Sequence, residues 1–389
     1  MDTNDFLGSV AQEDVTFSTR IVRTKRVGDN FWKCMIFVEP GRFVNTADVG
    51  WENIPGSSTI KALVVTAADY ASYTTGVLQS WLYDLFCNGN NGDCILVACP
   101  GTTVEAFKTN MTTAYAALKA YAYHKTVCAA PTVALDGTFV LDTDVAVELA
   151  KLCKADKGLL SSAPYLPFTT TTPETPSSDA LYAALIEAGE DAFLSAHQDV
   201  TRNGALYSLG LALSTLNGSG TSVGTSMDMI KSANITASGP NGTSLAKAVR
   251  DMLFEKNIQT LKPVGDNSGN VSAKGASTLN GDVVQATWIV AYVTYMTKIA
   301  VAKLITVPDY LKNESSYGDI LGKMFSYIGK FGPSGSGRLR NIQSHAPAYG
   351  SLPPARGDQI IIPDAWSAVY VDQIREVQVT GTLYIGEGE

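Results

Sequence analysis

The chain has 389 residues, of which 45% are hydrophobic and 17% are charged, and its formal net charge is −8. This composition is typical of a folded globular protein, and the length exceeds what one hydrophobic core normally holds, so two or three domains are expected. The acidic balance argues against a nucleic-acid-binding protein, because such proteins present a basic surface to the phosphates.

The N-terminal segment, residues 1–26, is predicted to form a strand outside the main sheet. Its first ten residues contain two aspartates and no apolar stretch, so a secretory signal peptide is not expected. Val15, Phe17 and Ile21 then fall on one face of an extended chain, with polar residues between them. We therefore assign this segment to an N-terminal arm.

Residues 27–163 are predicted to form the first part of an α/β core. Apolar runs alternate here with segments whose apolar residues recur at helical spacing, as around Trp81 and Met111. This alternation predicts an α/β (or α+β) sandwich in which helices cover the faces of a sheet. The runs predicted to be strands are IKALVVTA, CILVACP, KTVCAAP and KGLLSSA, beginning at Ile60, Cys94, Lys125 and Lys157.

The six cysteines are predicted to be mostly buried thiols. No Cys-x-x-Cys pair occurs, and the three histidines do not cluster with the cysteines, so no zinc site is expected. Cys94 and Cys99 lie five residues apart on a predicted strand, so they point to opposite faces and cannot pair. Cys87 and Cys94 flank an Asn/Gly-rich turn, and a disulfide between these two is the alternative.

The second half of the chain divides into an insertion and a further part of the core. Residues 164–243 begin with a Pro/Thr/Ser-rich stretch and contain long polar segments, which predicts a segment on the outer surface. Residues 244–374 are predicted to contain a helix that ends near Asn257, then a hairpin or meander with turns at Gly265–Asp266 and Asn280–Gly281, and a buried amphipathic helix within 283–305. Polar residues interrupt the apolar helix, so a membrane span is not expected.

The C-terminal segment, residues 375–389, has the most regular strand pattern in the chain. Val377, Val379, Leu383 and Ile385 share one face, and mostly polar residues share the other. Monomeric proteins normally avoid unpaired strand edges such as these two terminal segments would carry. Pairing with the sheets of neighbouring subunits would satisfy their backbone groups and would link subunits head to tail.

No motif for catalysis or for cofactor binding is found. Gly218–Gly224 lacks the G-x-G-x-x-G spacing, and Gly332–Arg340 lacks the Gly-Lys-Ser/Thr ending of a phosphate-binding loop. Asp142 and Asp144 could form a carboxylate pair on an extended chain, but an aspartate at a helix N-cap is the favoured interpretation. His124 is predicted at a helix C-terminus. We therefore predict no catalytic residue, no cofactor and no metal site.

Three segments resemble contractile tail sheath proteins, which form the outer tubes of contractile bacteriophage tails and related injection machines. In LYDLFCNGNNGDCILVACPG, which begins at Leu82, an aromatic helix, an Asn-Gly turn and an apolar strand follow one another. The turn is longer than in the family, and Cys99–Pro100 stands where an arginine is usual. LFEKNIQTLKPVGDNSGNVSAKGASTLNGD, from Leu253, is similar to a strand that leads to a glycine hairpin and a Thr-Leu-x-Gly turn. REVQVTGTLYI, from Arg375, is similar to the terminal strand of sheath proteins.

The resemblance implies a multi-domain sheath-like body with extended terminal strand arms and no enzymatic activity. It implies a helical homo-oligomer, formed by strand exchange, that surrounds a tail tube and contracts to drive the tube through the host envelope. The implied partners are further copies of the chain, the tail tube protein, and the baseplate and tail terminator proteins, without direct nucleic-acid contact or membrane insertion. The implied location is the tail of the virion, assembled in the bacterial host cytoplasm. The alternatives are an α/β enzyme with an unrecognised site, or a tube or baseplate protein.

Overall fold

The structure is a computed structural model of the chain. The residues that it describes are 32–87, 92–119, 124–130, 142–156, 165–167, 180–187, 192–199, 201–210, 235–263, 271–274, 278–281, 283–305, 313–335, 337–353, 362 and 365–370. Its helices and strands are, in chain order, β1 (Trp32–Val38), β2 (Glu52–Asn53), β3 (Lys61–Thr66), α1 (Tyr70–Tyr73), α2 (Gly76–Phe86), β4 (Asp93–Ala98), α3 (Val104–Leu118), β5 (His124–Ala129), α4 (Thr143–Ala155), β6 (Tyr165–Pro167), α5 (Ala180–Glu187), β7 (Ser195–His197), η5 (Pro240–Gly242), α7 (Lys247–Glu255), β8 (Thr260–Pro263), β9 (Val271–Lys274), α8 (Val284–Ile305), α9 (Glu314–Gly329), β10 (Leu339–Ser344), η6 (Tyr349–Ser351) and β11 (Trp366–Tyr370).

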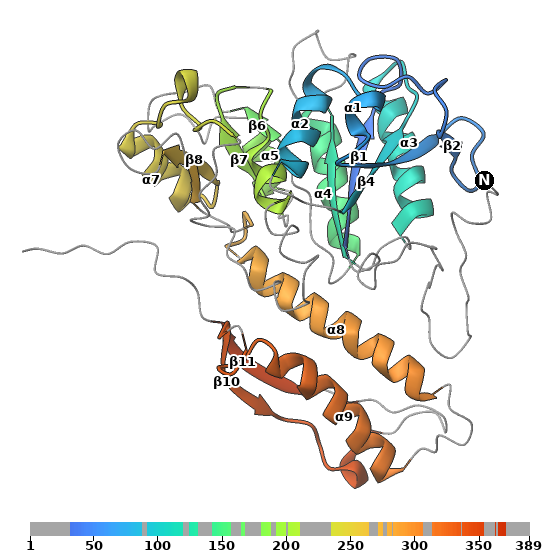
Figure 1. Cartoon of the computed structure of the whole chain (residues 1–389), viewed down its shortest axis with the longest axis vertical. Helices are drawn as coiled ribbons and strands as arrows, with labels where there is room; N and C mark the ends of the chain where they lie inside the picture. The colour runs from blue at the N-terminus through green and yellow to red at the C-terminus, as the bar shows by residue number, and fades with distance from the viewer. Residues whose placement is uncertain are drawn as a thin grey trace, which may run out of the picture.

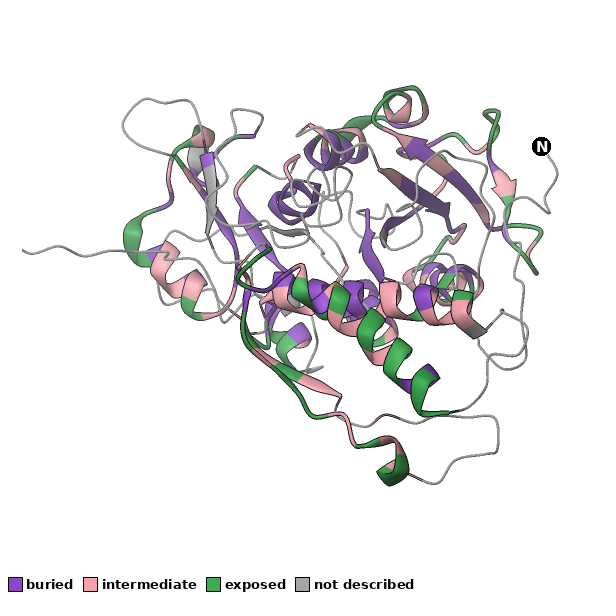
Figure 2. Cartoon of the chain, turned by 60° about the horizontal axis from the view of Figure 1, so that its bottom comes forward, coloured by how far each residue is buried: buried purple, intermediate pink, exposed green. Residues whose placement is uncertain are grey.

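A five-stranded sheet in the order β2-β3-β4-β1-β5 is the largest sheet among the described residues. β1 runs parallel to both β4 and β5, whereas β3 is antiparallel to β4 and β2 is antiparallel to β3. The inner strands are nearly continuous apolar runs, which is typical of parallel strands covered on both faces (Figure 2). The strands predicted at β3, β4 and β5 are confirmed, whereas β1 is absent from the predicted elements.

Helices cover both faces of this sheet, and the α/β class is confirmed (Figure 1). On one face, Trp81 of α2 and Trp288 of α8 pack on strand residues such as Ile36. On the other face, Met111 of α3 and Leu149 of α4 form the core with the alternate strand residues. The side chain of Asp142 caps α4 by accepting hydrogen bonds from the backbone N–H groups of its first turn, as predicted.

The cysteines of the sheet are buried free thiols, as predicted. Cys94 lies in the core beneath α2 and Cys99 lies in the core beneath α3 and α4, so the two point to opposite faces. Cys87 is half-buried and is also a free thiol, so the alternative of a Cys87–Cys94 disulfide is wrong.

A group of short strands lies beside the sheet. β6 and β7 are parallel, and β8 pairs with β9 as the predicted hairpin. β7 is joined to the residues before β8, because the backbone of Gln259 donates to Leu194 O at 2.9 Å and accepts from Ala196 N at 2.9 Å. Leu185 of α5 and Leu253 of α7 enter the same core as α3 and α4. The short strands and the main sheet therefore share apolar packing.

The C-terminal part consists of α8, α9 and the antiparallel pair β10–β11. α8 lies between the α/β body and the layer formed by α9 and β10–β11 (Figure 1). Trp288, 1% exposed, packs edge-on against His124 with ring centroids 6.1 Å apart. None of the described helices combines the length and the hydrophobicity that a membrane crossing requires.

The prediction for His124 is wrong. His124 is the first residue of β5, opposite Trp32 of β1, and its side chain is fully buried. α3 ends at Leu118, and burial lowers the pKa of His124 to about 3. The pairing with β1 therefore extends the strand by one residue and places the imidazole inside the protein as the neutral form.

Candidate functional site

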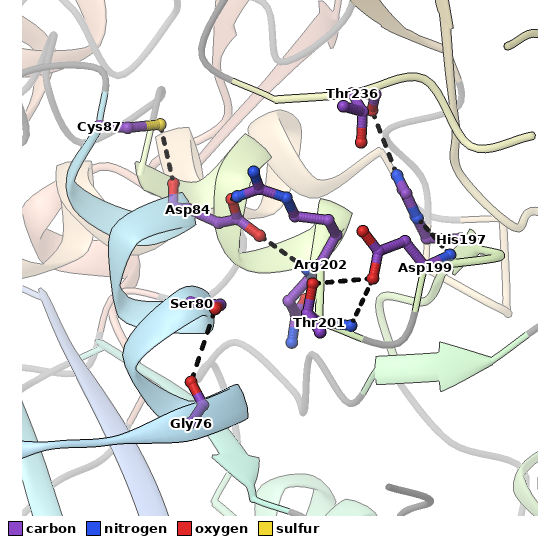
Figure 3. A network of polar contacts seen from close by, with 10 residues as sticks. Gly76, Ser80, Asp84, Cys87, His197, Asp199, Thr201, Arg202 and Thr236 are labelled. Carbon is purple, nitrogen blue, oxygen red and sulfur yellow. Dashed lines mark hydrogen bonds and ion pairs between the residues drawn. The ribbon is translucent and has the colours of Figure 1, made fainter. Parts of the chain in front are cut away.

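A buried polar cluster joins α2 to residues 197–210 (Figure 3). The Asp84 side chain, on the buried face of α2, is 0% exposed. Arg202 Nη1 donates to Asp84 Oδ1 at 2.9 Å, and the backbone N–H of Asn203 donates to Asp84 Oδ2 at 2.8 Å. Both carboxylate oxygens are thereby bound by a segment that lies more than a hundred residues further along the chain.

The segment that holds Asp84 starts a helix. Asn203 Oδ1 accepts from the backbone N–H of Leu206 at 3.0 Å, as an N-cap does, and residues 204–210 are helical. At the far end of this turn, Gly210 lies against α2 so closely that an added Cβ would overlap the carbonyl oxygen of Leu85. Glycine is thus required at this approach.

A turn beside Asp84 holds Arg202 in place. The backbone N–H of Asp199 donates to His197 Nδ1 at 2.9 Å, so the imidazole proton lies on Nε2, which is 3.2 Å from Thr236 O. Asp199 Oδ1 accepts from the backbone N–H of Thr201 at 2.9 Å and from its hydroxyl at 2.7 Å. Burial lowers the pKa of His197, which favours this neutral form.

Burial dominates the electrostatics of the cluster. It raises the pKa of Asp84 to about 7, although the Asn203 N–H and the Arg202 guanidinium both act to lower it. Burial also raises the pKa of the Cys87 thiol to about 12, and the Asp84 charge adds to that effect. The Arg202 guanidinium lies 5.7 Å from the centre of the Tyr83 ring and is a quarter exposed.

The described contacts of the cluster join α2 to the segment that contains Arg202 and Asn203. The polar atoms of Asp84, His197 and Asp199 described above bond to neighbouring protein groups. Within the described ranges, no group of three or more His, Cys, Asp or Glu side chains is placed to hold a metal ion. The carboxylate and the guanidinium join α2 to the residues that begin the helical segment 204–210.

A second charged group lies where the parallel strands begin. Lys33 and Lys125 are neighbours on β1 and β5, and Lys33 forms an ion pair with Asp93. Burial lowers the pKa of Lys125 to about 8, while Asp156, which accepts from Tyr115 Oη at 2.5 Å, acts to raise it. Open parallel sheets bind ligands beyond the carboxyl ends of their strands, so this group lies at the opposite end from the usual site.

The β10–β11 pair is a candidate assembly surface. It is a separate two-stranded sheet, and within the described part of the chain neither strand pairs with a third. Arg340 lies opposite Val369, and both are exposed, Val369 by 54%. The register shifts between Arg340 and Gln343, where Asn341 adopts a φ of 51°. The sheet therefore has a hydrophobic residue on its outward face and, among the described residues, two strand edges without a partner strand.

Most of the functional residues predicted from the sequence lie outside the described part of the chain. The arm residues Val15, Phe17, Ile21, Val377, Val379, Leu383 and Ile385 all lie outside the described residues, as does Gly218–Gly224. Within Gly332–Arg340, Gly332 and Gly335 lie in a turn after α9, and Leu339 and Arg340 begin β10. The division of the chain into a body and arms stays a prediction.

The Asp84 cluster is absent from the sites predicted from the sequence, although the sequence of α2 contains a signal for it. Asp84 follows Trp81 by three residues and so lies on the apolar stripe of the helix, together with Leu85. A carboxylate at such a position is buried, and a buried carboxylate requires a partner.

No protein-family model matches this chain, and no curated protein shows significant similarity to it.

Proposed function

We propose that the chain is the subunit of a contractile tail sheath, a structural protein that works by assembly and not by catalysis. The observation that supports this most is the β10–β11 sheet, which precedes the strongly alternating segment 375–389 by only a few residues. A two-stranded sheet and a segment whose alternation predicts a strand thus lie next to each other in the sequence.

Within the described residues, the outer edges of β10 and β11 have no partner strand. Exposed strand edges invite pairing with another chain. A terminal strand from a neighbouring subunit would extend β10–β11, satisfy its backbone groups and cover the exposed Val369. Each subunit would offer both a strand and a sheet, so the contact is head to tail and generates rings or helical tubes.

The proposed mechanism uses two packings of one sequence. Subunits would surround a tail tube in an extended lattice, and a signal from the baseplate would let the folded bodies form new side-to-side contacts while the arms keep them linked. The work would come from the difference in free energy between the two packings, without nucleotide hydrolysis. The partners would be the tail tube, baseplate and tail terminator proteins, and the location the virion tail.

Negative-stain electron microscopy of the purified full-length chain at rising concentration tests this proposal. Hollow, striated tubes are the expected product, because the strand donor and the acceptor sheet are in the same chain. Light scattering that gives a mass near 41.3 kDa at every concentration, with only single particles on the grid, would contradict self-assembly.

A further inference from the structure

Ser195 and Gln259 lie side by side among the short strands, where helical residues 204–208 cover them. Ser195 of β7 pairs with Gln259 in a parallel bridge, and the backbone hydrogen bonds of Gln259 to Leu194 O and from Ala196 N flank this bridge. Residues paired in this way direct their side chains to the same side, with the two backbones about 4.8 Å apart. We call Ser195, Gln259 and the helical residues that cover them the Ser195–Gln259 site.

The helix closes the site from the opposite side. Ser208 Oγ donates to Gln259 Oε1 at 2.8 Å, and a Cβ added to Gly204 would overlap Ser195 Oγ. Gly204 and Ser208 are four residues apart and therefore share one face of the helix. Ser195, Ser208 and Gln259 are each 0% exposed. The polar atoms of the site are thus enclosed by the protein.

Two of these atoms, Ser195 Oγ and Gln259 Nε2, have no hydrogen-bond partner among the described residues. Reversing the amide of Gln259 would not change this, because Ser208 bonds to one amide atom and the other would stay unpaired. An unpaired buried donor or acceptor costs free energy, and the large majority of buried polar side-chain atoms bond to protein or to ordered water. The site therefore requires a further partner that fits inside the protein.

We propose that the Ser195–Gln259 site binds an internal water molecule, which accepts a hydrogen bond from Gln259 Nε2 and donates one to Ser195 Oγ. The two atoms belong to paired residues but do not bond to each other, and one bridging water completes such an arrangement. A water molecule donates and accepts at the same time, so it suits an amide donor beside a hydroxyl. This inference concerns the folded subunit and does not depend on the proposed function.

The bound water would complete a continuous polar contact from the helix to β7. Ser208 would be linked to Ser195 through Gln259 and the water. Apolar packing lies on both sides of this contact, since Leu194 belongs to the core beneath α3 and α4, and Leu206 belongs to the core beneath α2. Apolar contacts are not directional, whereas a fully bonded polar chain specifies one arrangement. The site would therefore fix the position of β7 relative to the helix.

Thermal unfolding of the dilute full-length chain with Ser195→Ala tests the proposal, because a hydrated and a dry site predict different signs. If water bridges the two residues, loss of the hydroxyl removes a hydrogen bond, and the midpoint should fall by about 1–2 °C. If Ser195 Oγ has no partner at all, its removal relieves a buried unpaired group. A midpoint that rises or stays the same would therefore overturn the proposal.

Ser208→Ala is the matched control, because it removes the same atom from a hydrogen bond that forms directly between protein groups. Its midpoint should fall and so gives the effect of losing one hydrogen bond in this site. A fall in Ser208→Ala without a fall in Ser195→Ala would overturn the bridge.

A high-resolution crystallographic or electron-microscopy map of the full-length chain provides a second measurement that requires no variant. Density for one water within about 3 Å of both Ser195 Oγ and Gln259 Nε2 is the expected result. A direct hydrogen bond between these two atoms, or side chains packed without a water between them, would overturn the proposal even if Ser195→Ala does not fold.

Discussion

Gly210 lies where helical residues 204–210 meet α2, and its lack of a side chain is a packing requirement. An alanine Cβ at this position would overlap the Leu85 carbonyl oxygen, a backbone atom that cannot move aside cheaply. We expect Gly210→Ala to destabilise the protein by about 1–3 kcal/mol, as overpacked sites do. Thermal unfolding measures the loss as a lower midpoint.

Gly322→Ala is the control for this prediction. Gly322 lies inside α9, and a Cβ there would meet nothing within 4 Å. Alanine should raise stability by up to about 1 kcal/mol, because glycine in a helix interior costs conformational entropy. Equal effects of the two substitutions would show that the close approach of Gly210 to α2 does not matter.

Single residues show which contacts can be predicted from the sequence and which cannot. Asp142 was predictable as an N-cap because the N–H groups that it accepts from lie within three residues of it. The partner of Asp84 was not predictable, because Arg202 lies 118 residues away and no local period encodes that distance. His124 was misplaced for the same reason, since a strand pairing with Trp32 decides its position.

At the scale of elements, α8 is the link between the sheet and the C-terminal part. Trp288 is buried in the core of the sheet, whereas Val290 on the same helix is 51% exposed. We expect Trp288→Ala to cost about 3–5 kcal/mol through the cavity that it leaves. Val290→Ala should change stability by less than about 0.5 kcal/mol.

Urea unfolding of the two α8 variants measures this difference in stability from the transition midpoints. The slope of each transition reports how much surface is exposed on unfolding. If α8 joins both parts cooperatively, Trp288→Ala should lower the midpoint of one common transition. Similar midpoints for the two variants would mean that the first half of α8 does not pack in the core as described.

Helices and strands with a clear local hydrophobic period were predicted. Strands that are defined by pairing with distant parts of the chain were not. α2, α3, β3, β4 and β5 follow one another with a clear change between helical and strand periods. β1 is the strand between β4 and β5, yet in sequence it follows the N-terminal segment and precedes two turns, so no neighbouring pattern identifies it. The β10–β11 pair was missed because its alternation is weak and its register shifts near Asn341.

At the scale of the whole molecule, the proposed assembly depends on the segment from Val377 to Glu389. Removing it should leave the five-stranded sheet intact, since helices before residue 371 cover both of its faces in the described part of the chain. The truncated chain should keep the thermal midpoint of the wild type but remain a single particle in electron micrographs, because the proposed donor strand is gone.

Val379→Asp in the full-length chain should also prevent assembly, as it would place an unpaired charge between subunits. Val379→Ile, which keeps a β-branched apolar side chain, is the control and should assemble. Tubes of wild-type appearance from the truncated chain would contradict strand donation by this segment, and a fall in its thermal midpoint would show that the segment instead belongs to the fold of its own subunit.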